Sequence, residues 1–288
     1  MLRVVHAASE IAPFCTTGAV AEVAAALPAA LARALPDGSR VVVLAPLQRC
    51  VEQVAARRGI ALIDAGWSLR PLGEHGPEAR VVLVQAPDQR HTVGFIRCPP
   101  LAEDPLRFAA FTRAVVEAAP ALLGGAPDIA HAHDWHAGLL PLLIRQHASA
   151  DVRRAWAGAK SVFTIHTLRD QGVFPKTWVE RLGLRWDDFG IDGFEWHDQL
   201  SFLKAGVVFS DATAISPSRA AAITTEEHGQ GLHGLFASMG SRLRGIPNGS
   251  DQARRAPRDT SWSGSATRYA ALYAELLHER ARTTRVQT

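Results

Sequence analysis

A run of polar residues separates two apolar segments near the middle of the chain. Residues 126–145 read A-P-D-I-A-H-A-H-D-W-H-A-G-L-L-P-L-L-I-R. The stretch 129–131 predicts a buried strand. The apolar residues after the polar run predict a helix, which Asp134 would cap by accepting hydrogen bonds from its first free N–H groups. In open α/β sheets, ligands bind at the carboxyl ends of the strands. The sequence therefore predicts a binding or catalytic site here, formed by His131, His133, Asp134, Trp135 and His136.

Two kinds of chemistry fit this run. The side chains of His133 and Asp134 suit the recognition of sugar hydroxyls, with a helix cap and a core histidine as the structural alternative. His131 and His133 share one face of a strand and could chelate a metal, as in hydrolases with an H-x-H-x-D-H run. Here the aspartate comes one residue too early, and residue 134 points to the other face. We expect no metal and no other cofactor, and a metal-dependent hydrolase remains the alternative.

Other candidate residues follow the same logic. His166 ends a predicted strand, 161–165, and is either a cleft residue or a polar strand terminus. The loop T-T-G-A at 16–19 precedes a predicted helix and could hold an anion through its backbone N–H groups, although a plain turn is the alternative. Lys204 lies in a predicted helix, where lysine often covers apolar surface with its stem. Four tryptophans could stack on sugar rings or serve packing alone: Trp135, Trp178, Trp186 and Trp196.

These residues need a scaffold of alternating strands and helices. Apolar and β-branched runs predict strands at 2–8, 40–45, 60–63, 79–85, 93–98, 129–131, 161–165 and 212–215. Helical patterns occupy 20–35, with Pro28 inside, and 105–123, 178–184, 199–209, 220–227 and 266–282. The order predicts one doubly wound, mostly parallel α/β sheet covered on both faces, with antiparallel pairing within 60–98.

Composition excludes several classes of protein. The chain has 288 residues, 47% of them apolar, with 31 Lys and Arg against 28 Asp and Glu. No basic run with interleaved aromatics predicts a nucleic-acid partner. No apolar run is long enough to predict a membrane-spanning helix, and the N-terminus does not have the apolar region of a secretory signal peptide. Cys15, Cys50 and Cys98 lack C-x-x-C spacing, so we expect free thiols without a disulfide framework in a reducing cytoplasm.

Five stretches resemble, in order and spacing, the motifs of bacterial glycogen synthases and plant starch synthases. They are S-E-I-A-P-F with T-T-G-A-V-A-E-V (9–23), H-A-H-D-W-H-A-G-L-L-P (131–141), V-F-T-I-H-T-L-R-D-Q-G-V-F-P (162–175), F-L-K-A-G-V-V-F-S-D-A-T-A-I-S-P (202–217) and G-Q-G-L-H-G-L (229–235). The resemblance covers residues 1–249. It implies the N-terminal, acceptor-side, Rossmann-like half of a GT-B glycosyltransferase.

The resemblance also implies an activity and its residues. The family transfers glucose from ADP-glucose or UDP-glucose to an α-1,4-glucan, without a metal. Asp134 and His166 match its catalytic positions. Residues Thr16, Thr17, Gly18 and Ala19 match its donor-phosphate loop. The sugar-side candidates are His133, Trp135, Thr167, Gln171 and Lys204.

The chain departs from the family at several of these positions. Thr16 replaces the lysine that contacts donor phosphates, and Ala19 replaces a glycine. Thr167 replaces an asparagine, and Asp170 an aromatic residue. A transition state that develops negative charge needs fixed cations or N–H donors, and losing one such donor costs about 10²–10³ in rate. We therefore expect binding of ADP-glucose or UDP-glucose to be weak or absent.

The region after residue 249 departs as well. Where the family continues into a second Rossmann-like domain, residues 250–265 read as a linker rich in Arg, Pro, Ser and Thr. Residues 266–288 then resemble the family's final helix, with Tyr269, Leu272, Tyr273, Leu276 and Leu277 on one stripe that would pack back on the domain. We expect a module that binds α-1,4-glucan or maltooligosaccharide without autonomous catalysis. The alternative is a transferase completed by a protein partner that supplies a C-terminal domain.

Overall fold

The computed structural model describes the chain except for residues 74–75, 86–89, 99–100, 102–103, 148, 251–260 and 287–288, together with the side chains of 280–286. Within the described residues, a nine-stranded sheet has the order β12-β11-β7-β6-β1-β2-β5-β4-β3. The strands are β1 (Arg3–Ala7), β2 (Arg40–Pro46), β3 (Leu62–Leu69), β4 (Ala79–Val84), β5 (His91–Arg97), β6 (Ile129–His133), β7 (Lys160–Thr164), β11 (Ala212–Ile215) and β12 (Leu243–Gly245).

The sheet is parallel from β12 to β5 and antiparallel from β5 to β3. The predicted mixed α/β sheet is therefore confirmed. Nearly every residue of β2 and β6 is buried, because helices cover both faces and continuous apolar runs suit strands of that kind. The parallel register sets Val4, Val5, His6 and Ala7 of β1 beside 129–132 of β6.

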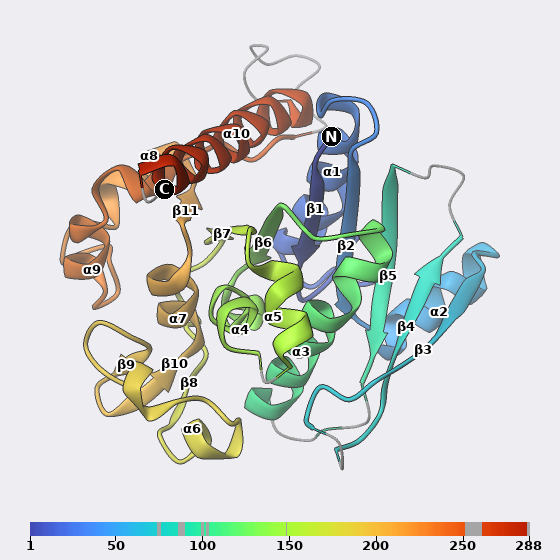
Figure 1. Cartoon of the computed structure of the whole chain (residues 1–288), viewed down its shortest axis with the longest axis horizontal. Coiled ribbons are helices and arrows are strands. Elements are labelled where there is room, and N and C mark those ends of the chain that lie inside the picture. Colours follow the sequence, from blue (N-terminus) through green and yellow to red (C-terminus); the bar gives the residue numbers. More distant parts are fainter. Residues whose placement is uncertain are drawn as a thin grey trace.

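Helices form a layer on each face (Figure 1). One layer packs α3 (Asp104–Leu123), α4 (Leu140–Gln146), α5 (Ala150–Trp156) and α7 (Phe202–Phe209) in one apolar cluster. The opposite layer packs α1 (Ala19–Ala34) and α10 (Trp262–Val286) against Val4, Val41, Ile129 and Val162. Smaller helices are α2 (Arg49–Arg58), α6 (Trp178–Arg181), α8 (Pro217–Ala222) and α9 (His233–Ser238). Helix α2 was not anticipated from the sequence.

The segment of the chain between β7 and α7 forms a small subdomain, which we call the annex. Its three-stranded antiparallel sheet has the order β8-β10-β9, formed by β8 (Val173–Pro175), β9 (Glu195–Trp196) and β10 (Gln199–Ser201). The predicted helix 199–209 is therefore wrong at its start. Residues 199–201 pair with two strands, and Ser201 then caps α7 by accepting a hydrogen bond from Lys204 N at 3.1 Å.

Other predicted boundaries also shift. The predicted helix 220–227 is instead 217–222, which begins at Pro217 because proline suits the first helical turn. The predicted helix 178–184 ends at Arg181, before Gly183 with its positive φ of 61°. The predicted strand 60–63 becomes 62–69. Most of the predicted linker, 251–260, lies outside the described residues, and residues 262–265 are already helical.

Helix α10 packs back on the sheet as the apolar stripe predicted (Figure 1). Tyr269, Leu272, Tyr273 and Leu276 are buried, and Leu277 is partly buried against the same cluster. The helix lies along α1 and reaches β7. Its tyrosines carry hydroxyl groups into the core, so α10 contributes polar partners as well as apolar surface.

The expectation of three free thiols is wrong for two of them. Cys15 and Cys50 form a disulfide, with their Cα atoms 5.6 Å apart. The bond joins the loop before α1 to the first turn of α2, two segments whose proximity depends on the parallel pairing of β1 with β2. Cys98 is a free thiol, and burial raises its pKa to about 12.

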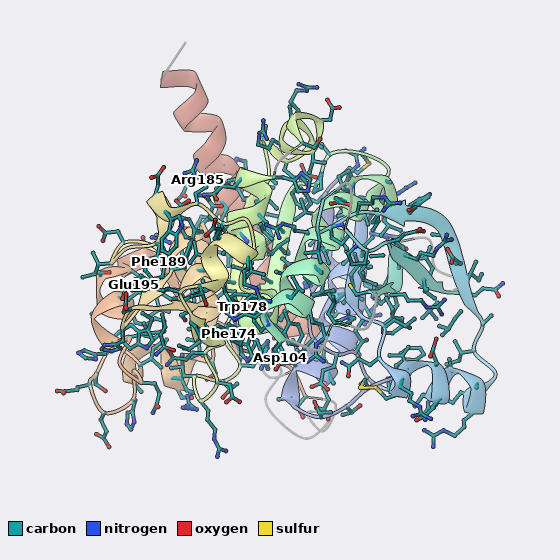
Figure 2. All side chains as sticks on the ribbon, turned by 90° about the horizontal axis from the view of Figure 1, so that it is seen from below. Asp104, Phe174, Trp178, Arg185, Phe189 and Glu195 are labelled. Atoms are coloured by element: carbon teal, nitrogen blue, oxygen red, sulfur yellow. A yellow bond between two sulfur atoms is a disulfide. The ribbon has the colours of Figure 1, made fainter. Side chains whose placement is uncertain are left out.

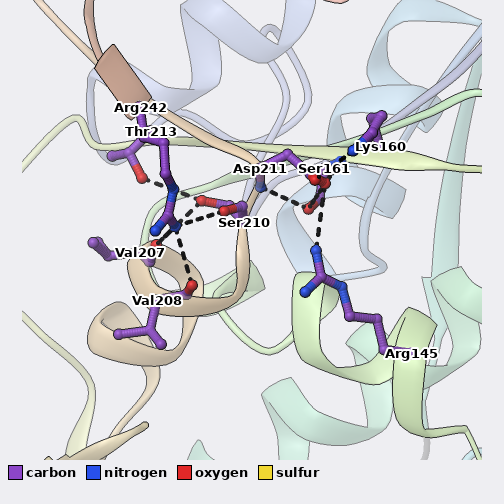
Figure 3. A network of polar contacts seen from close by, with 9 residues as sticks. All are labelled: Arg145, Lys160, Ser161, Val207, Val208, Ser210, Asp211, Thr213 and Arg242. Atoms are coloured by element: carbon purple, nitrogen blue, oxygen red, sulfur yellow. Dashed lines mark hydrogen bonds and ion pairs between the residues drawn. The ribbon is translucent and has the colours of Figure 1, made fainter. Parts of the chain in front are cut away.

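A half-buried aspartate, Asp211, lies immediately before β11 and contacts residues of the neighbouring strand β7. The carboxylate of Asp211 accepts hydrogen bonds from Lys160 Nζ at 3.0 Å and from Ser161 N at 2.8 Å, and it faces Arg145 (Figure 3). These contacts hold the pKa of Asp211 below its usual range despite burial. Arg242 donates hydrogen bonds to the carbonyl oxygens of Val207, Val208 and Ser210 at the end of α7.

No helix in the described part of the chain is long and apolar enough to cross a membrane.

Candidate functional site

A pocket of about 610 Å³ lies at the carboxyl ends of β1, β6 and β7. The loops that follow these strands supply its wall, as the position of the polar residues predicted. Its lining residues are Ser9, Glu10, Thr17, Gly18, Ala19, Val20, Gln48, Arg107, Phe108, Asp134, His136, His166, Thr167 and Arg169. The pocket thus brings together Asp134, His166, Thr167 and most of the loop 16–19.

Asp134 braces the loop after β7 and does not cap the following helix. It comes directly after β6, with φ of 55°, and only 2% of its surface is exposed. Its Oδ1 accepts hydrogen bonds from His166 N at 2.7 Å and Thr167 N at 3.3 Å. No side-chain cap is formed at the short 3-10 helix 135–137, so the predicted cap is wrong. The carboxylate instead satisfies N–H groups 32 and 33 residues away and holds His166 at the pocket wall.

Burial governs the charge of Asp134. Removing the carboxylate from water raises its pKa to about 7, although the hydrogen bonds from His166 and Thr167 oppose this rise. A positive φ in an aspartate is also an uncommon conformation that surrounding contacts must hold. Both features are characteristic of residues at functional sites.

Three imidazoles form a row that leads from the core to the pocket. His6 Nδ1 lies 3.0 Å from His133 Nε2, and His133 Nδ1 lies 3.1 Å from His166 Nε2. Burial lowers the pKa of His6 to about 3 and of His166 to about 4, and it lowers the pKa of His133 well below its ordinary value. The three rings are therefore neutral at pH 7. His133 contacts His166 from behind and does not line the pocket wall.

His131 belongs to the core and not to the pocket. Its Nδ1 lies 2.7 Å from the hydroxyl of Tyr273, and its Nε2 lies 2.7 Å from Thr164 Oγ1. Tyr269 completes the cluster through a contact with Thr164 Oγ1 at 3.0 Å. The ring thus anchors α10 to the sheet.

The imidazole cluster could hold a metal only by breaking these contacts. Among the described residues, one potential metal-binding group is present: His6, His131 and His133 each place a nitrogen within 4.8 Å of the others. Both nitrogens of His131 already have partners, and Asp134 and His136 contact other groups. The geometry favours hydrogen-bonded imidazoles over the hydrolase-type site considered from the sequence.

The loop before α1 holds a carboxylate of its own chain. Glu10 accepts hydrogen bonds from Thr17 N at 2.6 Å, Thr17 Oγ1 at 2.7 Å and Gly18 N at 2.8 Å. Helix α1 begins at Ala19 without a side-chain cap. Two N–H groups that could face an anion are thus already paired with a negative charge. Thr16 is exposed and is not among the pocket residues.

A second hollow, of about 430 Å³, adjoins the pocket through Arg169. Its other lining residues are Asp104, Trp135, Asp170, Gln171, Gly172, Val173, Phe174 and Trp196, of which Figure 2 labels Asp104 and Phe174. Trp135 stacks on His136 with 3.9 Å between ring centroids. Gly172 has φ of 57°, and a Cβ there would lie 2.4 Å from Trp135 Cε3, so only glycine permits this approach. Aromatic faces beside carboxylates are suited to sugar rings.

The structure does not bring Lys204 to either hollow. Only 4% of its surface is exposed, and its Nζ donates to the carbonyl oxygens of Ile191 at 2.7 Å and Glu195 at 2.6 Å. Burial lowers its pKa. Lys204 therefore supports the annex. Trp178 is buried beneath Arg181 and Trp186 is exposed, and neither lines these two hollows.

Several site residues were missed from the sequence. Glu10 follows β1 by three residues, so the rule that polar residues gather at strand ends could have identified it. Arg107 and Arg169 line the pocket but come from α3 and from the loop after β7, where an isolated arginine carries no distinct signal. His6 lies within an apolar strand, and its partner His133 is known only once β1 and β6 are paired.

Comparisons with known proteins agree on one family. Residues 3–238 match the family described as "Starch synthase catalytic domain". The glycogen synthase of Anaeromyxobacter sp. (strain Fw109-5) is 40% identical over 258 residues, which cover 87% of this chain and 52% of the relative. The glycogen synthase of Myxococcus xanthus (strain DK1622) is 39% identical over 282 residues, covering 91% and 56%. The chain thus spans about half the length of the curated relatives it matches.

A solved structure is similar as well. The catalytic domain of Starch Synthase IV from Arabidopsis thaliana, bound to ADP and acarbose, superposes with a TM-score of 0.73 at 25% identity. The match covers 87% of this chain and 52% of that one.

Proposed function

The chain belongs to the starch synthase catalytic domain family, and from this premise we propose that it is a glucan-binding module that does not transfer glucose on its own. Its ligand would be an α-1,4-glucan or maltooligosaccharide. The carrying observation is a pocket that retains Asp134 and His166 beside an aromatic hollow, while Glu10 occupies the phosphate-loop N–H groups.

The site offers groups suited to a neutral sugar. His166 is a neutral imidazole at pH 7, and Thr167 lies next to it on the pocket wall. Hydroxyl groups both donate and accept hydrogen bonds, so neutral rings and hydroxyl side chains can pair with them without a charge. Trp135, Phe174 and Trp196 line the adjoining hollow with apolar surface on which a further sugar unit could rest.

The same site is poor for a nucleotide diphosphate. No lysine stands at Thr16, and Glu10 places a carboxylate against the loop. Arg107 and Arg169 line the pocket, and Arg107 is already paired with Asp104 at 2.5 Å. Transfer also requires donor and acceptor to be held together, because proximity supplies much of the rate. Residues 250–261 are too few for the family's second domain, since domains need about 50 residues or more.

Two measurements test the proposal directly. Isothermal titration with maltoheptaose and acarbose measures sugar binding, and labelled ADP-glucose or UDP-glucose with glycogen measures transfer. We expect binding without transfer. Transfer that tracks the purified protein and disappears in His166→Ala would overturn the non-catalytic assignment. Absence of binding to maltoheptaose, acarbose and glycogen would overturn the glucan assignment.

A pair of variants locates the sugar. Trp196→Ala removes an aromatic face of the hollow and should weaken maltoheptaose binding roughly threefold to tenfold, the equivalent of about 0.5–1.5 kcal/mol for an aromatic contact. Trp186→Ala is the matched control, because this tryptophan is exposed and lies outside the hollow. Equal affinities for the two variants would move the glucan to another surface.

A second candidate function is a transferase completed by a separate subunit. Arg169 favours it, since it lines the pocket together with Thr17, Gly18 and Ala19 and its guanidinium could meet a nucleotide held by a partner. Mixing the chain with the C-terminal half of a full-length synthase tests it. Glucose transfer that appears only in the mixture would establish the two-subunit transferase. Absence of transfer at a saturating concentration of the partner would exclude it.

A further inference from the structure

We propose that the disulfide between Cys15 and Cys50 is a reversible redox clamp on the pocket, which a dithiol reductant opens. In the oxidised state the bond holds two segments of the pocket wall together, and its reduction lets both segments move. The clamp itself does not depend on the proposed function. Its effect on sugar affinity rests on that function, because the sugar is the proposed ligand.

The bond joins two segments that both contribute to the pocket wall. Cys15 belongs to the loop between β1 and α1, in which Glu10 and Thr17 line the pocket. Cys50 lies in the first turn of α2, two residues after Gln48, which lines the same pocket. The two cysteines have a sequence separation of 35, and their Cα atoms are 5.6 Å apart. The disulfide is therefore a covalent tie between two parts of one wall.

The noncovalent contacts between the two segments are modest. Val51 and Ala55 are the buried residues of α2, and they pack in one apolar cluster with Phe14 of the loop. A helix with so little buried surface opens locally at a low cost in free energy. Gln48 Nε2 donates a hydrogen bond to the carbonyl oxygen of Ser9 at 3.0 Å, at an exposed position. Loss of the disulfide therefore leaves the sheet folded but lets α2 and the loop open.

Cys50 is the more accessible end of the bond. It is half-buried, whereas only 7% of the surface of Cys15 is exposed. A thiolate of the reductant attacks Cys50 Sγ and forms a mixed disulfide, and Cys15 leaves as a thiolate that takes up a proton. The second thiolate of the reductant then displaces Cys50 from the mixed disulfide. Two cysteine thiols are formed, and the dithiol is oxidised to its own disulfide.

The third cysteine of the chain, Cys98, does not open the bond. Attack on a disulfide requires a thiolate, and burial raises the pKa of Cys98 to about 12, so this thiol stays protonated at pH 7. The state of the clamp is therefore set by an external dithiol. Cys98→Ser is then a matched control, because it removes a thiol and leaves the clamp intact.

Backbone hydrogen bonds of the loop report its state. Cys15 N donates to the carbonyl oxygen of Ile11 at 3.1 Å. Thr17 N and Gly18 N donate to the carboxylate of Glu10 at 2.6 and 2.8 Å. While these bonds are closed, the three amide hydrogens exchange slowly with solvent. Opening of the loop in the reduced protein breaks the bonds, so the exchange accelerates.

Hydrogen–deuterium exchange of the intact chain tests the clamp without any ligand. One sample is kept oxidised and the other is reduced with dithiothreitol at pH 7, and alkylation with mass spectrometry verifies the state of the bond. We expect the amides of Cys15, Thr17 and Gly18 to exchange about tenfold faster after reduction, whereas amides of β6 should not change. Equal exchange of the loop in both samples would overturn the clamp, as would a bond that dithiothreitol does not reduce in the folded protein.

Two serine variants distinguish the clamp from a general effect of the reductant. Cys50→Ser cannot form the bond, so it should exchange like the reduced wild type with or without dithiothreitol. Cys98→Ser keeps the bond and should respond to dithiothreitol as the wild type does. A response in Cys50→Ser, or its loss in Cys98→Ser, would overturn the assignment. If Cys50→Ser does not fold, the two states of the wild type still decide.

Titration with maltoheptaose connects the clamp to the proposed function. A ligand that must first order the loop binds more weakly, so the affinity should fall about threefold to tenfold on reduction. Equal affinity in both states would overturn control of the pocket by the bond. Accelerated exchange without sugar binding in either state would leave the clamp standing and count against the glucan pocket.

Discussion

Asp134 is both a structural brace of the pocket and a titratable group with a shifted pKa. Its carboxylate braces His166 and Thr167, and burial raises its pKa to about 7. Because the pKa of Asp134 is higher in the folded state than in the unfolded state, its protonation stabilises the folded protein. This contribution is complete below pH 4 and is lost as the pH rises through 7. The buried histidines act in the opposite direction, because their lowered pKa values favour folding at higher pH.

Asp134→Asn separates the titration of Asp134 from its hydrogen bonds to the loop after β7. The amide oxygen can still accept the two backbone hydrogen bonds, but it does not titrate. The free energy of unfolding of the wild type, relative to this variant, should fall between pH 4 and pH 7. A shift of three pKa units sets its upper size at about 4 kcal/mol. Urea unfolding at pH 4, 5, 6, 7 and 8 measures the difference, and a flat difference would show that Asp134 titrates normally.

Glu10 is the second residue of the pocket with a testable role. Its carboxylate accepts hydrogen bonds from Thr17 N and Gly18 N, the groups that the proposed function would otherwise leave for an anion. Glu10→Gln removes the negative charge, so ADP affinity should rise roughly tenfold, equivalent to about 1.4 kcal/mol. Titration calorimetry measures this affinity, with exposed Glu22→Gln of α1 as the control. If both variants bind ADP equally, repulsion by Glu10 is not what limits nucleotide binding.

At the scale of elements, the sequence predicted the strands better than their contacts. Apolar runs identified β1, β2, β6 and β7, because strands buried on both faces need continuous apolar residues. Helix α2 was missed because its sequence, R-C-V-E-Q-V-A-A-R-R, buries only Val51 and Ala55. The first turn of α7 was misplaced because β10 depends on pairing with β8 and β9.

Site contacts were harder to predict for the same reason. The cap assigned to Asp134 used a local rule, whereas its real partners lie after β7. The disulfide between Cys15 and Cys50 depends on a loop and the first turn of α2, which meet only once β1 and β2 pair. Side-chain partners far apart in sequence cannot be read from local pattern, even where both elements are correctly predicted.

Helix α10 is held by polar contacts as well as by its apolar stripe. Tyr273→Phe keeps the ring but leaves His131 Nδ1 buried without its partner at 2.7 Å. An unsatisfied buried group costs about 1–3 kcal/mol. We expect the free energy of unfolding to fall by that amount in urea titrations at pH 7. His278→Ala, at an exposed position of the same helix, should change it little. Equal effects would mean that the hydroxyl contact adds no stability.

At the scale of the whole molecule, a nine-stranded sheet carries the pocket at the ends of its parallel strands. Helices cover both faces of the sheet, and α10 packs together with α1 on one of these faces. The pocket and the aromatic hollow open at the strand ends beside each other and share Arg169. A fold closed in this way can bind a ligand as a rigid body, so ligand binding should appear as added stability of the whole chain.

Ligand-dependent unfolding therefore reports on the function of the entire molecule. A ligand that binds only the folded state stabilises it by about 2.7 kcal/mol at 100 times its dissociation constant. Maltoheptaose at that excess should raise the free energy of unfolding accordingly, and the gain should shrink in Trp196→Ala but persist in Trp186→Ala. ADP at equal concentration should give a smaller gain, because Glu10 faces the loop. Stabilisation by ADP but not by maltoheptaose would assign the pocket to nucleotides and reverse the proposed role of the chain.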